Sequence, residues 1–132
     1  MKCLDTTFLI DVLRNDKDAF KKASEIESDN IVTTSINFFE CVLGIHLEKE
    51  GNKELKMQKF KDMILNINIL PFNIKSSFIA SKIAADLIKK GQKIDDLDNL
   101  IAGTMLANNC NIVVTRDIKH FKRIKGIKVE SY

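Results

Sequence analysis

The chain has 132 residues, of which 45% are hydrophobic and 30% are charged, and its formal net charge at pH 7 is +3. This length suits one domain with a substantial core, so we expect residues 1–132 to form a single domain. No apolar run approaches the roughly 18–20 residues of a membrane span, and the first residues lack the pattern of a secretory signal.

Short apolar runs alternate with longer segments of helical period, which predicts an α/β fold with a parallel sheet covered by helices. The expected strands are residues 2–5, 30–34, 67–70, 111–115 and 127–130. The expected helices are residues 6–14, 16–28, 35–50, 52–66, 73–91 and 95–109. Gly91 is a natural C-cap for the fifth of these helices.

Three cysteines lie far apart in the chain, at Cys3, Cys41 and Cys110. Their odd number and wide spacing exclude a disulfide framework and a metal knuckle, and they predict reduced thiols in a cytoplasmic protein. The lysines are abundant and dispersed, which is compatible with a polyanionic partner.

Four acidic residues lie where a parallel sheet would gather them. In such a sheet, ligands bind outside the carboxyl ends of the strands, at the point where the strand order reverses. Asp5 and Asp117 follow the first and fourth expected strands. Glu40 lies about one turn into the helix after the second strand, and Asp98 lies in the first turn of the sixth helix. The four carboxylates are therefore expected at one end of the sheet.

Helix capping is the alternative interpretation of these acids. An aspartate between a strand and a helix often accepts a hydrogen bond from a free backbone N–H, and we favour this interpretation for Asp117 taken alone. Asp95 or Asp96 is a still better candidate for a cap, with Asp98 as a favourable first-turn charge. Asp5 and Glu40 differ, because their neighbours are largely apolar and an unpaired buried carboxylate is costly.

A group of carboxylates repels itself unless a cation lies among them. Oxygen ligands without thiolates or imidazoles suit Mg²⁺ or Mn²⁺, which can activate water for attack on a phosphodiester. Neither His46 nor His120 is expected to bind the metal; His46 lies six residues beyond Glu40 and should point away from it. The residues therefore predict metal-dependent phosphodiester hydrolysis.

Three segments resemble the PIN-domain ribonucleases, and most closely the small VapC-type toxins of prokaryotic toxin–antitoxin pairs. They are LDTTFLID, TTSINFFECVLGI and DLDNLIAGTMLANNCNIVVTRDIKHF, and the resemblance spans nearly the whole chain. The resemblance implies a three-layer α/β/α sandwich with a central parallel sheet of four to five strands. Gly103 stands where the family usually has alanine, which we expect only to loosen helix packing slightly.

The resemblance also implies roles for individual residues. Position by position, the metal-binding and catalytic acids of the family fall on Asp5, Glu40, Asp98 and Asp117. Thr6 and Thr115 match supporting positions, and Asp96 is a weaker candidate for contact with a second metal ion. The implied cofactor is Mg²⁺ or Mn²⁺, and the implied partners are an RNA substrate, a second copy of the chain and a small antitoxin, with no membrane.

Several alternatives stay open or are disfavoured. A housekeeping PIN nuclease of rRNA or tRNA maturation and a catalytically silent PIN-like binding module are the rivals; the short chain disfavours the first and the four acids disfavour the second. A haloacid-dehalogenase phosphatase needs an acid at position 7, where the chain has Thr7. A receiver domain needs an acid after the third strand, and a nucleotide-binding fold needs a glycine-rich loop; the chain has neither.

Two further patterns concern surfaces. The segments INFFECVLGI and FKDMILNINIL carry more large apolar residues than one side of a small sheet can cover, which predicts an apolar face shared by two copies. The segment FKRIKG fits either a basic rim for RNA or a solvated run of charges.

Overall fold

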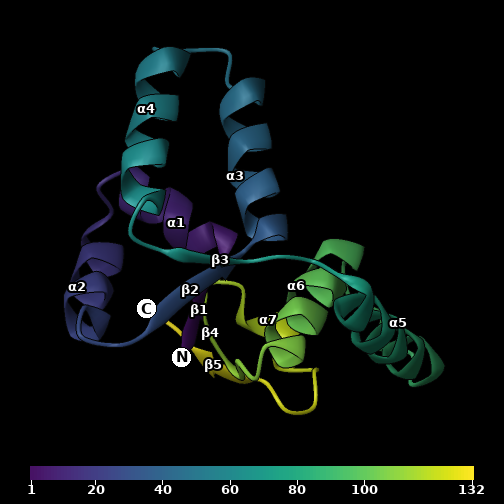
Figure 1. The fold of residues 1–132 in the computed structure, drawn as a ribbon. Helices are drawn as coiled ribbons and strands as arrows, with labels where there is room; N and C mark the ends of the chain where they lie inside the picture. The colour runs from purple at the N-terminus through teal and green to yellow at the C-terminus, as the bar shows by residue number, and fades with distance from the viewer.

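Five parallel strands form one central sheet in the computed structural model, which describes residues 1–132 throughout (Figure 1). The strands are β1 (Lys2–Leu4), β2 (Ile31–Thr34), β3 (Asn68–Leu70), β4 (Ile112–Val114) and β5 (Lys128–Glu130). Their order across the sheet is β3-β2-β1-β4-β5, and every neighbouring pair is parallel. All five expected strands are confirmed, each shorter by one or two residues.

Seven helices connect and cover these strands. They are α1 (Thr6–Leu13), α2 (Lys17–Ile26), α3 (Ser35–Leu47), α4 (Lys53–Ile64), α5 (Ile74–Lys89), α6 (Asp96–Ala107) and α7 (Ile118–Phe121). Side chains of Asp16, Asn52 and Asn73 accept hydrogen bonds from backbone N–H groups and so fix where three of the helices begin. The six expected helices are confirmed. The four-residue α7 was not expected, because one turn is too short to show a helical period.

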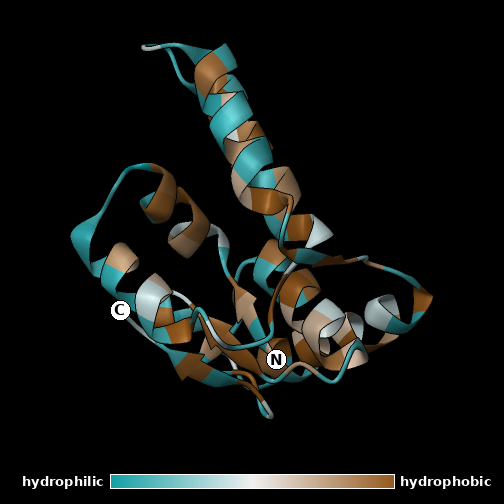
Figure 2. Ribbon diagram, turned by 60° about the vertical axis from the view of Figure 1, so that its left-hand side comes forward, coloured by the Kyte–Doolittle hydropathy of each residue, from teal (hydrophilic) through white to brown (hydrophobic).

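The core consists of two layers on opposite faces of the sheet, which confirms the three-layer α/β/α sandwich. Cys3 and Val113 point into the layer formed with α5 and α6, while Leu4 and Val114 point into the layer formed with α1 and α3. Successive strand residues are therefore buried on both faces, as is usual in a parallel sheet. Figure 2 shows the central strands as mainly hydrophobic and the helices as alternating hydrophobic and hydrophilic residues.

Gly103 allows α5 and α6 to pack closely. A Cβ atom at this position would lie 2.5 Å from the Ala80 Cβ and 2.7 Å from the Ser76 carbonyl oxygen. The expectation that this glycine only loosens helix packing is therefore wrong, because its missing side chain is what lets the two backbones approach.

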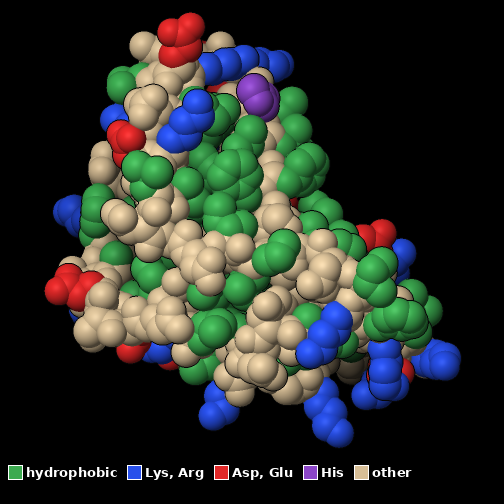
Figure 3. Space-filling model, in the orientation of Figure 1, with side chains coloured by type: hydrophobic (Ala, Val, Ile, Leu, Met, Phe, Trp, Pro, Cys, Tyr) green, Lys and Arg blue, Asp and Glu red, His purple; other side chains and the backbone are tan.

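The antiparallel pair α3 and α4 projects from the sheet (Figure 1) and exposes apolar side chains along one stripe. Phe39, Leu43 and Leu47 are spaced four residues apart on α3, and they are 53%, 41% and 69% exposed. Figure 3 shows hydrophobic side chains gathered over this helix pair. None of the helices is both long enough and apolar enough to cross a membrane.

The strand order reverses between β1 and β4. From β1 the chain adds β2 and β3 on one side of the sheet, then returns to add β4 and β5 on the other. The loops that leave β1 and β4 diverge at this point, and open parallel sheets bind ligands in the crevice so formed. Asp5 and Thr115 follow these two strands directly.

Candidate active site

Asp5 is a buried carboxylate at the reversal point, with only 4% of its surface exposed. Although it precedes α1, its side chain does not cap that helix. Its Oδ1 accepts a hydrogen bond from the Asn37 Nδ2 at 3.0 Å, and its Oδ2 accepts one from the Thr115 Oγ1 at 2.6 Å. Burial raises the pKa of Asp5, and the hydrogen bond from Thr115 is the largest effect in the opposite direction.

Glu40 is half-buried on α3 and is linked through Thr6 to the start of α1. The Thr6 hydroxyl donates a hydrogen bond to the Glu40 Oε1 at 2.8 Å and accepts one from the Asn37 amide at 3.1 Å. Burial raises the pKa of Glu40, the bond from Thr6 lowers it, and the nearby charge of Asp5 raises it further. Thr6 therefore bridges Glu40 and Asn37 by hydrogen bonds, and its supporting role stays a prediction.

Asn37 joins the two acids, and the sequence reasoning did not identify it. Its Oδ1 accepts bonds from the Thr34 hydroxyl at 2.7 Å and the Thr34 backbone N–H at 3.3 Å. Because the Thr34 N–H can only donate, the Asn37 amide nitrogen must face Asp5 and Thr6. A polar residue three positions before Glu40, in an otherwise apolar turn, was the signal available in the sequence.

Asp98, Asp117 and His120 form a second group beside Asp5. One ligand atom from each of the three lies within 4.8 Å of the other two. The His120 Nδ1 is 2.6 Å from the Asp98 Oδ2 and 3.5 Å from the Asp117 Oδ2. Burial raises the pKa of Asp98 to about 6, although the hydrogen bond with His120 lowers it. His120 was not expected at this site, yet its ring lies among the acids, three residues beyond Asp117 on the short α7.

Thr115 connects the two groups of acids. Its buried hydroxyl donates to Asp5 and accepts a hydrogen bond from the Asp117 backbone N–H at 2.9 Å. The Asp117 side chain makes no capping bond to α7, so the capping interpretation of this residue is wrong. The carboxylate of Asp117 is left free to face Asp98 and His120.

Two other acids at the start of α6 lie outside this arrangement. Asp95 accepts a hydrogen bond from the Leu97 backbone N–H at 3.0 Å, which confirms it as a cap. Asp96 is exposed in the first turn of α6 and makes no hydrogen bond or ion pair with the other acids. The structure therefore does not bring Asp96 to the site.

The site carries more negative charge than its protein surroundings balance. No lysine or arginine forms an ion pair with Asp5, Glu40, Asp98 or Asp117; His120 is the one basic side chain that contacts the acids. A set of carboxylates with one imidazole and no thiolate is the donor chemistry of a divalent cation such as Mg²⁺ or Mn²⁺. The residues present therefore fit the predicted metal.

Comparison with known proteins gives consistent matches over nearly the whole chain. The family model for the PIN domain matches residues 2–127. Ribonuclease VapC1 of Methanocaldococcus jannaschii is 33% identical, over 96% of this chain and 84% of its own length. The tRNA(fMet)-specific endonuclease VapC of Salmonella typhimurium is 25% identical, over 98% of this chain and 96% of its own. The crystal structure of VapBC2 from Rickettsia felis, bound to a promoter DNA fragment, contains a chain that superposes with a TM-score of 0.87 at 26% identity. That superposition covers 99% of this chain and 98% of the other.

Proposed function

We propose that this chain, which belongs to the PIN-domain family, is a metal-dependent endoribonuclease and the toxin of a toxin–antitoxin pair. Within the family it belongs to the VapC ribonucleases. The observation that carries this proposal is the group formed by Asp98, Asp117 and His120, whose ligand atoms lie within 4.8 Å of one another. Asp5 and Glu40 lie beside this group, joined to each other through Asn37 and Thr6.

The ion would be held by carboxylate oxygens of Asp5, Asp98 and Asp117, with Glu40 beside them. Once bound, such an ion would supply neutralisation of charge on the scissile phosphate and activation of a water for attack on phosphorus. Mg²⁺ and Mn²⁺ are the proposed ions, because the donor set is made mainly of carboxylate oxygens.

The remaining polar residues position these acids. His120 orients the Asp98 carboxylate, and the Thr115 hydroxyl fixes both Asp5 and the turn that carries Asp117. The Oε1 of Glu40 is occupied by the Thr6 hydroxyl, whereas its Oε2 makes no hydrogen bond within the protein. We assign this free Oε2 to accept the proton of the attacking water, a role that suits a carboxylate whose pKa is raised by burial.

The proposal includes a homodimer and an antitoxin. A stripe of exposed apolar residues on α3 (Phe39, Leu43 and Leu47) supports a face that a second copy covers. Light scattering at micromolar concentration should give about twice the 15.0 kDa mass of the chain. A cytoplasmic location is supported by three cysteines that are all buried and unpaired.

The direct test is cleavage of RNA by the purified chain, free of any antitoxin. An unstructured pool of single-stranded RNA should be cut in Mg²⁺ or Mn²⁺ and left intact in excess chelator. Cleavage that persists in chelator would overturn the metal mechanism. Tight RNA binding without cleavage in either metal would favour a catalytically silent binding module instead. A small reading frame immediately upstream of the gene would favour the toxin over a housekeeping nuclease.

A further inference from the structure

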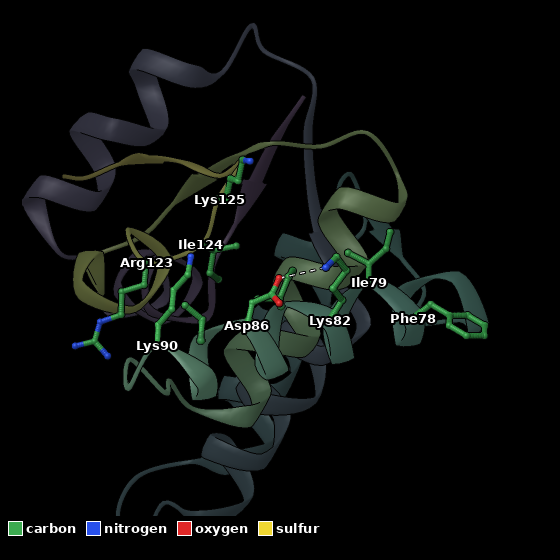
Figure 4. A pocket seen from close by; sticks show the side chains of 10 residues that line it. Phe78, Ile79, Lys82, Asp86, Lys90, Arg123, Ile124 and Lys125 are labelled. Carbon is green, nitrogen blue, oxygen red and sulfur yellow. Dashed lines mark hydrogen bonds and ion pairs between the residues drawn. The ribbon is translucent and has the colours of Figure 1, made fainter.

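A hollow of about 630 Å³ lies between α5 and the segment that follows α7, apart from the acidic group (Figure 4). Its apolar lining includes Ile83 and Leu87 of α5 and Ile124 of the opposite wall. Cationic side chains surround it: Lys90 directly follows α5, and Arg123 and Lys125 belong to the segment FKRIKG, residues 121–126. The proposed catalytic site gives this basic segment no role.

Most of the positive charge around this hollow is not neutralised by the protein. Lys82 pairs with Asp86 at 3.5 Å, and both are exposed. Lys90 and Lys125 are exposed and form no ion pair with any carboxylate, and Arg123 donates only to the backbone carbonyls of Gln92 and Lys93. Three cationic residues at this apolar depression therefore have no anionic partner.

The hollow is structurally connected to the acidic site. The Nη1 of Arg123 lies 3.2 Å from the Gln92 carbonyl oxygen and 3.1 Å from that of Lys93, in the connection between α5 and α6. That connection leads directly to the first turn of α6, which carries Asp98. Arg123 also follows His120 by three residues, and its backbone N–H donates to the His120 carbonyl. The α5–α6 connection and the segment from His120 to Arg123 thus contribute to both the hollow and the acidic site.

We propose that this hollow is a second binding subsite for RNA, which holds nucleotides of the substrate away from the scissile bond. Lys90, Arg123 and Lys125 would contact phosphates, and the apolar lining would take a base or a ribose. This inference rests on the proposed ribonuclease function and adds to it the place where the rest of the substrate binds.

Charge complementarity favours RNA over an apolar protein segment as the occupant. An apolar helix would cover the lining but would leave three cations without anions, whereas a polynucleotide supplies one phosphate per residue. Small-ligand pockets span about 300–1,000 Å³, so the hollow is of a size to hold a nucleotide. The acidic site itself repels a phosphate chain, and cations nearby would offset that repulsion.

The test measures binding of a fluorescent single-stranded RNA in chelator, where no cleavage occurs, at several salt concentrations. The double variant Lys90→Gln/Lys125→Gln is compared with Lys17→Gln/Lys61→Gln, which removes two exposed, unpaired lysines from α2 and α4. Both variants lose the same charge. If the hollow binds two phosphates through Lys90 and Lys125, the slope of log affinity against log salt should become shallower by about 1.4 in the first variant only, at about 0.7 per phosphate contact.

The outcomes separate this inference from the proposed function. A several-fold loss of affinity with the shallower slope in Lys90→Gln/Lys125→Gln alone, at unchanged thermal stability, supports the subsite. Equal slopes in the parent and both variants, or equal losses in both variants, would overturn it while leaving the nuclease proposal intact. If Lys90→Gln/Lys125→Gln has a lower mass than the parent by light scattering but binds RNA with unchanged affinity, the hollow contacts a second copy of the chain. That result would also overturn the subsite. A parent chain that neither binds nor cleaves RNA would refute the proposed function itself.

Discussion

The Nδ1 of His120 lies 2.6 Å from the Oδ2 of Asp98, which joins the short α7 to the first turn of α6. The same ring nitrogen lies 3.5 Å from the Asp117 carboxylate. His120 is thus the one basic side chain in contact with a set of acids that no lysine or arginine neutralises. Its contact with Asp98 holds that carboxylate in place, and the excess of negative charge is what a divalent cation would balance.

Replacing Asp98 by asparagine should separate a metal ligand from a structural acid. The raised pKa of Asp98 means that its surroundings disfavour the charged form despite the bond from His120. The metal-free Asp98→Asn protein should therefore be as stable as the parent or more stable at pH 8. Its stabilisation by Mn²⁺ should be strongly reduced, because one ligand has lost its charge. Thermal unfolding in chelator and in Mn²⁺ measures both effects.

Asp96→Asn is the matched control, because Asp96 lies in the same turn but is exposed and outside the site. It should gain as much from Mn²⁺ as the parent does. If Asp98→Asn instead melts lower in chelator and gains the full stabilisation from Mn²⁺, Asp98 is a structural residue and the site assignment is wrong.

The pKa of Asp98, about 6 in the folded protein, gives a pH dependence with a definite sign. It lies above the unfolded value of about 3.9, so in the metal-free protein the stability from this group is fully present below about pH 4 and is lost as the pH rises through 6. The unfolding free energy of Asp98→Asn, relative to the parent, should therefore be higher at pH 8 than at pH 4.

Mn²⁺ binding should respond to pH in the opposite direction. The ion needs the ionised carboxylate, so protons compete with it below about pH 6. The increase in melting temperature caused by Mn²⁺ should be large at pH 8 and small at pH 5. An equal increase at both pH values would show that no group titrating near 6 binds the ion.

Asn37→Asp should destabilise the protein above neutral pH. The new carboxylate oxygen would replace the amide nitrogen that lies 3.0 Å from the Asp5 Oδ1, and both sites are buried. At about 4 Å and an effective dielectric near 20, two like charges repel by roughly 4 kcal/mol, so we expect a loss of about 2–4 kcal/mol at pH 8. At pH 5 the two carboxylates can share a proton, which should restore part of the lost stability.

Urea unfolding at pH 8 and pH 5 measures this loss of stability. The control is Asn66→Asp, at an exposed position. Equal effects of the two substitutions would mean that Asn37 does not face Asp5.

Gly103→Ala should lower stability, although alanine usually favours a helix. The added Cβ would lie 2.5 Å from the Ala80 Cβ and 2.7 Å from backbone atoms of α5, which cannot move aside cheaply. Overpacking of this kind costs about 1–3 kcal/mol. Gly44→Ala on α3 is the control: beyond the adjoining backbone of α3, no atom would lie within 4 Å of the added Cβ, so the substitution should stabilise by up to about 1 kcal/mol. Calorimetry compares the melting temperatures of both variants with that of the parent. A more stable Gly103→Ala protein would refute close packing at this position.

The sheet and the candidate acids could both be predicted from the sequence, because both predictions depend on local pattern. Runs such as NIVVT are apolar on both faces, which marks a buried parallel strand, and acids at the ends of such strands must meet at one edge of the sheet. Asp5 and Asp117 were predicted in this way, whereas Glu40 and Asp98 were predicted from their places near the starts of two helices. Thr115 and Thr6 came from the family resemblance.

What the sequence could not provide depends on contacts between distant segments. His120 is separated from Asp98 by 22 positions, and its place follows from how the unpredicted α7 packs on α6. Asn37 reaches Asp5 only because α3 begins next to β1. The need for glycine at position 103 likewise arises from the approach of α5, which no local pattern records.

Mn²⁺ titration of the purified chain by calorimetry, alongside Asp98→Asn and Asp96→Asn, addresses the metal assignment itself. The parent and Asp96→Asn should bind the ion with similar affinity, and Asp98→Asn should bind it at least about ten-fold more weakly, because even residues behind the ligands cost about 10–100-fold when altered. No measurable binding to the parent, or equal binding to all three proteins, would mean that these carboxylates do not form a metal site.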